Sequence, residues 1–96
     1  MKPSAALEKN REAIRAAVNR YRTANPRVFG SVLHGDDAEG SDIDILVDAL
    51  PGATLLELCG LQLDLEKLLG VPVDLLTPGE LPQRIRAKVL SEAAPI

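Results

Sequence analysis

The chain has 96 residues, of which 46% are hydrophobic, with one phenylalanine, one tyrosine and no tryptophan, so we expect a single domain over residues 1–96 with an aliphatic core. The formal net charge of −3 argues against a general nucleic-acid binder, because such proteins usually carry a basic surplus. The single cysteine, Cys59, excludes an internal disulfide, and the lack of a long apolar run argues against a signal peptide or membrane span, so we expect a cytoplasmic protein.

The first predicted elements are a helix and a short strand. Apolar residues at helical spacing predict a helix from Ser4 to Ala24. Asn25-Pro26 is expected to end it, because the residue before proline disfavours helical backbone. Arg27-Val28-Phe29 then fits a short buried strand that leads into Gly30-Ser31. One helical turn fits residues 32–36, and residues 37–40 fit a surface loop.

The second half of the chain predicts two strands and two helices. Asp42 to Val47 is the clearest strand, with its aspartates on one side and its isoleucines on the other. A capping box at Thr54–Glu57 opens a helix that Gly70 ends. Residues 71–76 fit a third strand, residues 77–79 a turn, and a final helix begins near Leu81-Pro82. We expect the side chains of Ile85, Val89 and Leu90 in that helix to point inward.

The order of these elements predicts an α/β (α+β) fold, a small mixed sheet of three or more strands with helices on one face. The link between the first two strands is too short for a crossover helix, so we expect them to be antiparallel. The link between the second and third strands carries a helix, so that pair can be parallel.

The middle helix carries apolar residues on two sides. We expect one broad face to cover the sheet, formed by Leu55, Leu58, Leu65, Leu68 and Leu69. Leu56 and Leu63 project from nearly the opposite side, where they are either harmless exposed leucines or a protein contact. Cys59 fits the core or the helix surface.

A carboxylate pair is the strongest chemical signal. Asp42 and Asp44, two residues apart on a strand, point the same way and could hold two hard cations for in-line displacement at phosphorus. Asp74 lies mid-strand between apolar residues, where a lone buried charge would be costly unless something binds it, so it is the expected third member. Oxygen ligands favour magnesium. A pair of aspartates on a strand can also serve solubility alone.

The turn at Gly30-Ser31 fits a phosphate site. Glycine allows close backbone approach, and Ser31 supplies a hydroxyl and a backbone N–H. If a helical turn follows, its free N–H groups favour a phosphate. The alternative is an ordinary turn at a strand end, and only the spacing to the carboxylates favours the phosphate site.

The run GSVLHGDDAEGSDIDILV resembles the signature of the DNA polymerase β-like nucleotidyltransferase superfamily. It is most similar to the minimal nucleotidyltransferase (MNT) family, whose pattern is Gly-Ser, a turn containing glycine, then Ser-Asp-x-Asp. The resemblance implies a polymerase β-like fold, with Asp42, Asp44 and Asp74 as catalytic metal ligands. The nucleotide-binding residues that it implies are Gly30, Ser31, His34 and Ser41.

The chain departs from the family at His34, where many members have arginine. Arginine is permanently charged and grips a phosphate with two hydrogen bonds, whereas histidine is largely neutral near pH 7. His34 is therefore either a phosphate contact or an exposed loop residue. The basic group Arg84, Arg86 and Lys88 on the last helix likewise fits a solvated face or a contact to nucleotide or partner.

The resemblance implies the antitoxin of a HEPN–MNT toxin–antitoxin pair. Such a protein is a magnesium-dependent protein adenylyltransferase, which moves AMP from ATP to a tyrosine of the HEPN toxin and forms a hetero-oligomer with it. No membrane and no direct nucleic-acid partner is expected. Two alternatives stay open: an antitoxin that neutralises its partner by binding alone, and a stand-alone nucleotidyltransferase that acts on a small molecule.

Overall fold

A four-stranded sheet in the order β3-β2-β1-β4 organises the protein, whose computed structural model describes residues 1–96. β1 and β2 are antiparallel and β2 and β3 are parallel, as the link lengths predict. The bounds of the elements are α1 (Pro3–Lys9), α2 (Arg11–Asn19), β1 (Thr23–Phe29), α3 (Gly30–His34), β2 (Ile43–Ala49), α4 (Leu55–Leu69), β3 (Val73–Leu76), a 3-10 turn η1 (Pro78–Glu80), α5 (Gln83–Glu92) and β4 (Ala94–Pro95). The α/β class and the mixed sheet are confirmed.

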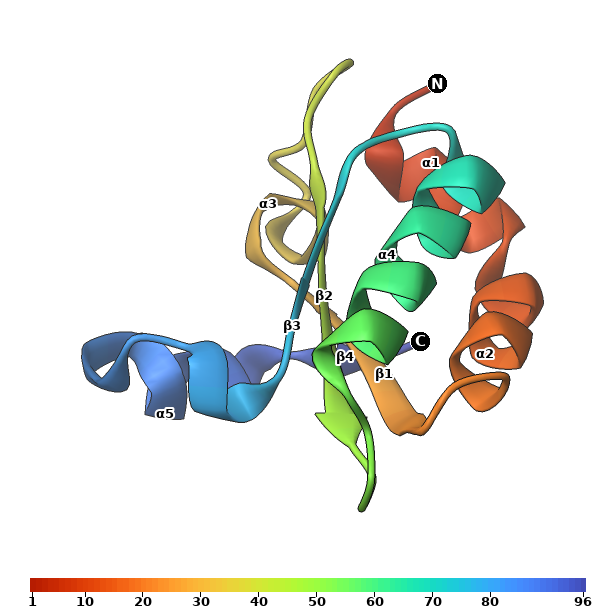
Figure 1. Ribbon diagram of the computed structural model, residues 1–96. Helices are drawn as coiled ribbons and strands as arrows, with labels where there is room; N and C mark the ends of the chain where they lie inside the picture. Colours follow the sequence, from red (N-terminus) through yellow and green to blue (C-terminus); the bar gives the residue numbers. More distant parts are fainter.

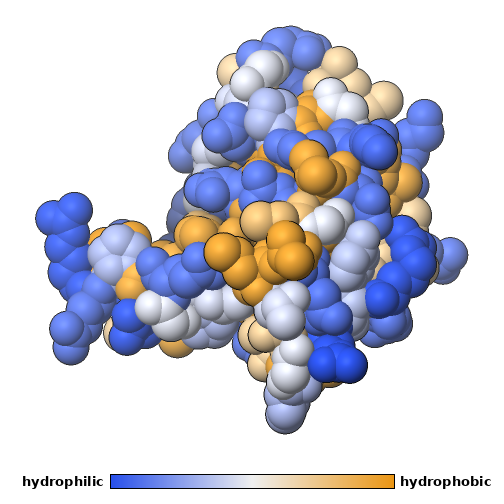
Figure 2. Space-filling model, viewed as in Figure 1, coloured by the Kyte–Doolittle hydropathy of each residue, from blue (hydrophilic) through white to orange (hydrophobic).

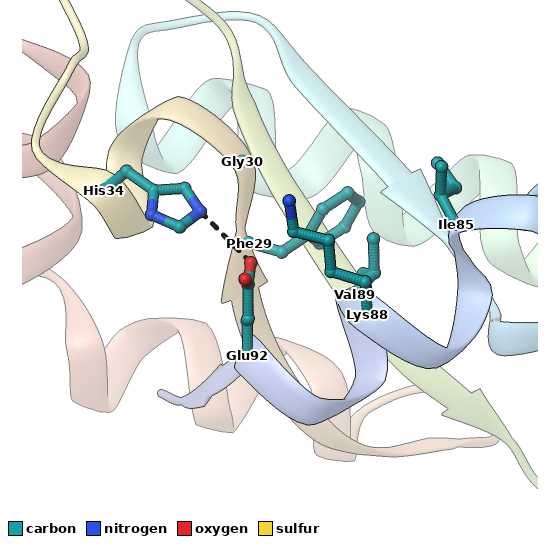
Figure 3. A pocket seen from close by; sticks show the side chains of 7 residues that line it. All are labelled: Phe29, Gly30, His34, Ile85, Lys88, Val89 and Glu92. Atoms are coloured by element: carbon teal, nitrogen blue, oxygen red, sulfur yellow. Dashed lines mark ion pairs between the residues drawn. The ribbon is translucent and has the colours of Figure 1, made fainter.

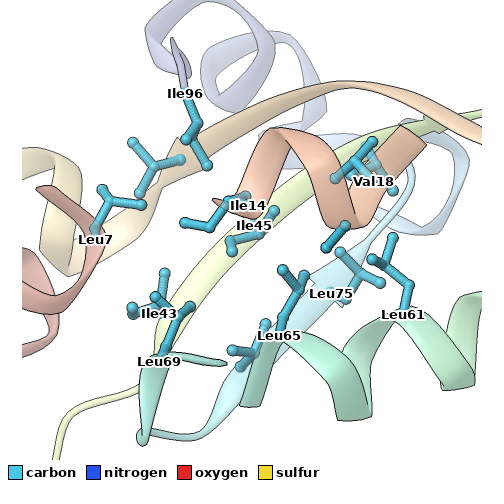
Figure 4. Packing of buried hydrophobic residues seen from close by; sticks show 14 of the residues in the cluster. Leu7, Ile14, Val18, Ile43, Ile45, Leu61, Leu65, Leu69, Leu75 and Ile96 are labelled. Atoms are coloured by element: carbon cyan, nitrogen blue, oxygen red, sulfur yellow. The ribbon is translucent and has the colours of Figure 1, made fainter. Parts of the chain in front are cut away.

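Helices α1, α2 and α4 cover one face of the sheet, while α5 lies on the other side and projects away from it (Figure 1). The core fills the space between these three helices and the strands (Figure 4). Its 16 buried residues include no aromatic side chain, so the aliphatic core expected from the composition is confirmed. Ile43, Ile45 and Val47 of β2 all belong to it. The opposite face of β2 is therefore free for Asp44 and Asp48, with the buried Leu46 between them.

The N-terminal segment forms two helices, so the prediction of one helix from Ser4 to Ala24 is wrong. Asn10 breaks the segment, where its side-chain amide donates to the Ala6 carbonyl at 2.8 Å and competes with the backbone ladder. The second helix ends at Asn19, and the Thr23 hydroxyl caps its end by donating to the Val18 carbonyl at 2.9 Å. Asn25-Pro26 consequently lies inside β1, at a bulge where Asn25 has φ +57°.

The last helix differs from the prediction. No residue of α5 is buried, and Ile85 and Leu90 are 39% and 41% exposed. The turn η1 directs the chain away from the core, so α5 meets the sheet only along part of its length (Figure 1). The Arg86 guanidinium holds this bend by donating to the carbonyls of Gly79 and Leu81 at 3.2 and 2.8 Å.

Helix α4 matches its predicted limits but not its predicted face. The Thr54 hydroxyl accepts from the Glu57 N–H at its start, and Gly70 ends it with φ +69°. Leu61, Leu65 and Leu69 form its buried side. Leu55 and Leu68 were expected there but are exposed, together with Leu56, Cys59 and Leu63. No helix of the protein combines the length and apolar character needed to cross a membrane.

Candidate active site

Two carboxylates lie side by side where β2 and β3 are paired, and a third directly precedes β2. The parallel register places Asp44 directly opposite Asp74, and residues in register on neighbouring strands point to the same face. Asp44 stands on the face away from the core, since its neighbours Ile43 and Ile45 are fully buried on the other side. The structure thus brings Asp44 and Asp74 together on one face, and Asp42 immediately precedes the same strand.

The electrostatics of Asp44 reflect this convergence. Burial raises the pKa of the Asp44 carboxyl above its ordinary value, and the negative charges of Asp74 and Asp42 raise it further. Asp44 therefore lies in a negative local field created in part by Asp74 and Asp42, which a bound cation would offset. Such a field is typical of sites that bind hard cations.

Two details of the sequence prediction need correction. Asp42 lies before β2, which begins at Ile43, so only Asp44 of the pair is held within a strand. Asp74 is exposed, so the argument from the cost of a buried charge was wrong. β3 is the edge strand of the sheet, which leaves Asp74 open to solvent. No three His, Cys, Asp or Glu side chains are arranged as a ready-made metal-binding group.

Gly30 lies against the Asp44 carboxylate. A Cβ atom at Gly30 would be 3.1 Å from Asp44 Cγ and still closer to Oδ2, and Gly30 has φ +73°. Both observations require glycine at this position. Ser31 follows as the second residue of the short helix α3, half-buried, and its carbonyl accepts from the Asp36 N–H at 2.9 Å. The sequence-predicted turn therefore touches the carboxylate cluster.

The loop between α3 and β2 is anchored at two points. The Asp37 carboxylate is buried and accepts from the Ser4 N–H of α1 at 2.9 Å, which lowers the pKa of the Asp37 carboxyl. The Ser41 hydroxyl oxygen accepts from the Ala38 N–H at 3.0 Å. The prediction of a plain surface loop thus missed Asp37, and Ser41 orders the loop just before Asp42.

A pocket of about 320 Å³ opens beside the turn, between α3 and α5 (Figure 3). His34, the last residue of α3, faces Glu92 of α5 with 3.2 Å between Nε2 and Oε2. The prediction had left open whether His34 is a loop residue or a phosphate contact, and here it lines the pocket. The lining residues are Phe29, Gly30, His34, Ile85, Lys88, Val89 and Glu92.

Sequence reasoning missed most of the α5 wall of this pocket. A signal was available, because Ile85, Lys88, Val89 and Glu92 recur at intervals of three and four residues and thus share one helix face. In the sequence, Arg84, Arg86 and Lys88 form one basic group on this helix. The structure separates them: Lys88 lines the pocket, Arg86 holds the bend before α5, and Arg84 is exposed outside the pocket.

The residues fit a divalent cation by their chemistry. Hard divalent cations prefer carboxylate oxygens as ligands. Burial is the main cause of the raised pKa of Asp44, and the negative charges of Asp74 and Asp42, which a cation would offset, contribute to it. The residues that would hold such an ion are Asp42, Asp44 and Asp74, of which Asp42 and Asp74 are exposed and free to reorient.

Known proteins place the chain in a family. The nucleotidyltransferase domain family matches residues 9–96. A Methanocaldococcus jannaschii protein named "Putative protein adenylyltransferase" is 39% identical over 69 residues, covering 72% of this chain and 74% of that protein. "Protein adenylyltransferase MntA" of Thermococcus cleftensis is 45% identical over 65 residues, 68% and 66% of the two chains. This chain belongs to the nucleotidyltransferase domain family and is a nucleotidyltransferase.

Solved structures agree with this assignment. A structure entitled "Structure of putative minimal nucleotidyltransferase" is 43% identical, with a TM-score of 0.86, and the alignment covers 97% of this chain and 95% of that one. The resemblance to minimal nucleotidyltransferases is thereby confirmed. A second structure, "Crystal structure of the toxin-antitoxin with AMP-PNP", shares the fold at 23% identity and a TM-score of 0.75, over 90% and 71% of the chains.

Proposed function

We propose that this chain is the antitoxin of a HEPN–MNT pair and transfers AMP from ATP to a tyrosine of its HEPN-domain partner, with magnesium as the metal. The observation that carries the proposal is the register of Asp44 opposite Asp74, with Gly30 packed against Asp44. The names of the relatives support protein adenylylation, and the toxin–antitoxin of like fold was crystallised with AMP-PNP.

The reaction would be a displacement at the α-phosphorus of ATP. The tyrosyl oxygen of the partner forms a bond to that phosphorus, the bond to the oxygen that bridges to the β-phosphate breaks, pyrophosphate leaves, and the tyrosyl proton is released. Bound magnesium would activate the acceptor oxygen and offset charge on the pyrophosphate. Asp42, Asp44 and Asp74 would hold the metal, and Gly30 would let the triphosphate approach the backbone beside them. Ser31, His34 and Ser41 would complete the nucleotide site.

An external acceptor fits the shape of the site. The carboxylates lie on an exposed sheet face next to an edge strand, and the pocket beside them is open at the surface. Helix α4 also carries three exposed leucines, Leu55, Leu56 and Leu63. Figure 2 shows hydrophobic side chains near the centre of the face on which α4 lies. A partner protein would both supply the tyrosine and cover apolar surface of this kind.

The test is a transfer assay. The protein is incubated with magnesium, ATP and a candidate HEPN-domain partner, and the intact mass of the partner is then measured. We expect the mass to increase by one or more AMP groups, and fragmentation to locate them on tyrosine. The matched control is the double variant Asp42→Asn/Asp44→Asn, which keeps the size of both side chains and is expected to abolish transfer.

The outcome separates the alternatives. If the partner gains no mass but the double variant still binds and neutralises it, the protein acts by occlusion alone. If no partner is bound or modified while a small hydroxylated acceptor gains AMP, the protein is a stand-alone transferase. Transfer that persists in the double variant would remove the carboxylates from the catalytic site.

A further inference from the structure

Gly30 connects the pocket between α3 and α5 with the carboxylate cluster. Gly30 lines the pocket on one side and packs against Asp44 on the other. A nucleotide whose reacting phosphate lay at the carboxylates would therefore extend its remaining phosphates along Gly30 and into this pocket. The charged residues that line the pocket would then interact with those phosphates.

The α3 side of the pocket offers little positive charge. Residues 30–35, the whole turn and helix, contain no lysine or arginine. His34 is the only basic residue there, and its Nε2 already faces the Glu92 carboxylate at 3.2 Å. If His34 is protonated, the Glu92 carboxylate offsets its positive charge. If His34 is neutral, this part of the pocket carries only the negative charge of Glu92.

Lys88 supplies the cation that the turn lacks. It lies one helical turn before Glu92 on the same face of α5, and it lines the pocket. Its side chain extends from α5 toward the α3 side (Figure 3). No ion pair of the protein includes Lys88. Phe29, Ile85 and Val89 form an apolar wall of the pocket, and apolar surroundings strengthen charge–charge attraction.

We propose that Lys88 binds the terminal phosphates of the nucleotide, so that α5 completes the phosphate site that the turn alone leaves without a permanent charge. This assignment rests on the proposed nucleotidyl transfer and adds a binding residue to it. A lysine acts as a point charge, so it attracts the negative phosphates without requiring a fixed geometry. It distinguishes ATP from AMP, because only ATP carries phosphates that reach beyond the carboxylate cluster.

The test measures nucleotide binding without a partner protein. AMP-PNP and AMP, each with magnesium, are titrated by calorimetry into the wild type, Lys88→Ala, Lys88→Arg and Arg84→Ala. Arg84 is the matched control, an exposed cation of the same helix outside the pocket. We expect Lys88→Ala to weaken AMP-PNP binding about tenfold or more and AMP binding less than about twofold. Lys88→Arg should retain affinity, and Arg84→Ala should bind as the wild type does.

Each other outcome overturns the assignment. Unchanged AMP-PNP affinity in Lys88→Ala, equal losses for AMP-PNP and AMP, or an equal loss in Arg84→Ala would each show that Lys88 does not recognise the terminal phosphates. In these cases transfer by the wild type still supports the proposed function. A wild-type protein that binds no AMP-PNP and transfers no AMP would instead overturn the proposed function together with this inference.

Discussion

Gly30 and Asp44 occupy neighbouring positions so close that no side chain fits between them. A Cβ at Gly30 would lie 3.1 Å from Asp44 Cγ, nearer still to Oδ2, and the backbone there has φ +73°. Because the Gly30-Ser31 turn and the carboxylate cluster share this contact, we expect a change in one to move the other. The geometry of the site therefore depends on a residue that has no chemistry of its own.

Gly30→Ala is expected to cost binding more than stability. The positive φ costs about 1–2 kcal/mol for any L-residue, and the new methyl group would push the Asp44 carboxylate out of place. Gly35→Ala is the matched control, since Gly35 has φ +74° but nothing near its Cβ. Chemical denaturation should show similar losses for both variants, while magnesium and AMP-PNP binding should fall only in Gly30→Ala. If both variants bind magnesium and AMP-PNP equally well, the contact between Gly30 and Asp44 does not position the site.

Asp44 and Asp48, on one strand, should respond to pH in opposite directions. Burial, Asp74 and Asp42 raise the pKa of Asp44 in the folded state. The folded state therefore binds the proton of Asp44 more tightly than the unfolded state does. This contribution to the free energy of unfolding is lost as the pH rises through the folded pKa of Asp44. A hydrogen bond from Arg27 lowers the pKa of Asp48, and one from Asn25 has a smaller effect. The contribution of Asp48 to stability is therefore present above the unfolded pKa and lost as the pH falls through the folded pKa.

The measurement is the unfolding free energy of Asp44→Asn and Asp48→Asn between about pH 3 and pH 8 without divalent metal. Asp44→Asn should be more stable than the wild type at neutral pH, with an advantage that shrinks as the pH falls. Asp48→Asn should be less stable at neutral pH, with a deficit that also shrinks. A loss of stability at neutral pH in Asp44→Asn would contradict the raised pKa of the Asp44 carboxyl in the folded protein.

The directions of the first three strands and the face of β2 that carries Asp44 could be predicted from the sequence because local rules determine them. Alternation along β2 places Ile43 and Ile45 in the core and Asp44 on the other face. The helix after β2 allows a parallel β3, which brings Asp74 opposite Asp44. These inferences needed only the period of a strand and the length of a connection.

The remaining features depend on particular side-chain contacts that the spacing of apolar residues does not reveal. The N-terminal helix breaks because the Asn10 side chain donates to the Ala6 carbonyl, and Thr23 stops the second helix by donating to Val18. The position of α5 depends on the bend that Arg86 holds, so its apolar residues did not reveal that they line a pocket instead of the core. Asp37 gave no signal either, because its partner Ser4 is 33 residues away.

Helix α4 allows a direct test of which leucines support the fold. Leu61 is fully buried, whereas Leu56 on the same helix is 83% exposed. Leu61→Ala should destabilise the protein by about 2–5 kcal/mol, because it leaves a cavity in the core. Leu56→Ala should change the unfolding free energy by less than about 0.5 kcal/mol. A large loss in Leu56→Ala, measured by urea denaturation of the isolated chain, would contradict the orientation of α4.

Magnesium is expected to stabilise the folded protein, because a bound cation relieves the mutual repulsion of Asp42, Asp44 and Asp74. A ligand at ten times its dissociation constant adds about 1.4 kcal/mol, which corresponds to a rise in melting temperature of about 6–11 °C for a chain of this size. The shift should appear with millimolar magnesium chloride and be absent with sodium chloride of equal ionic strength. Asp42→Asn/Asp44→Asn should lose the shift. An equal shift in both salts, or one that survives in the double variant, would mean that the cation acts elsewhere than on these carboxylates.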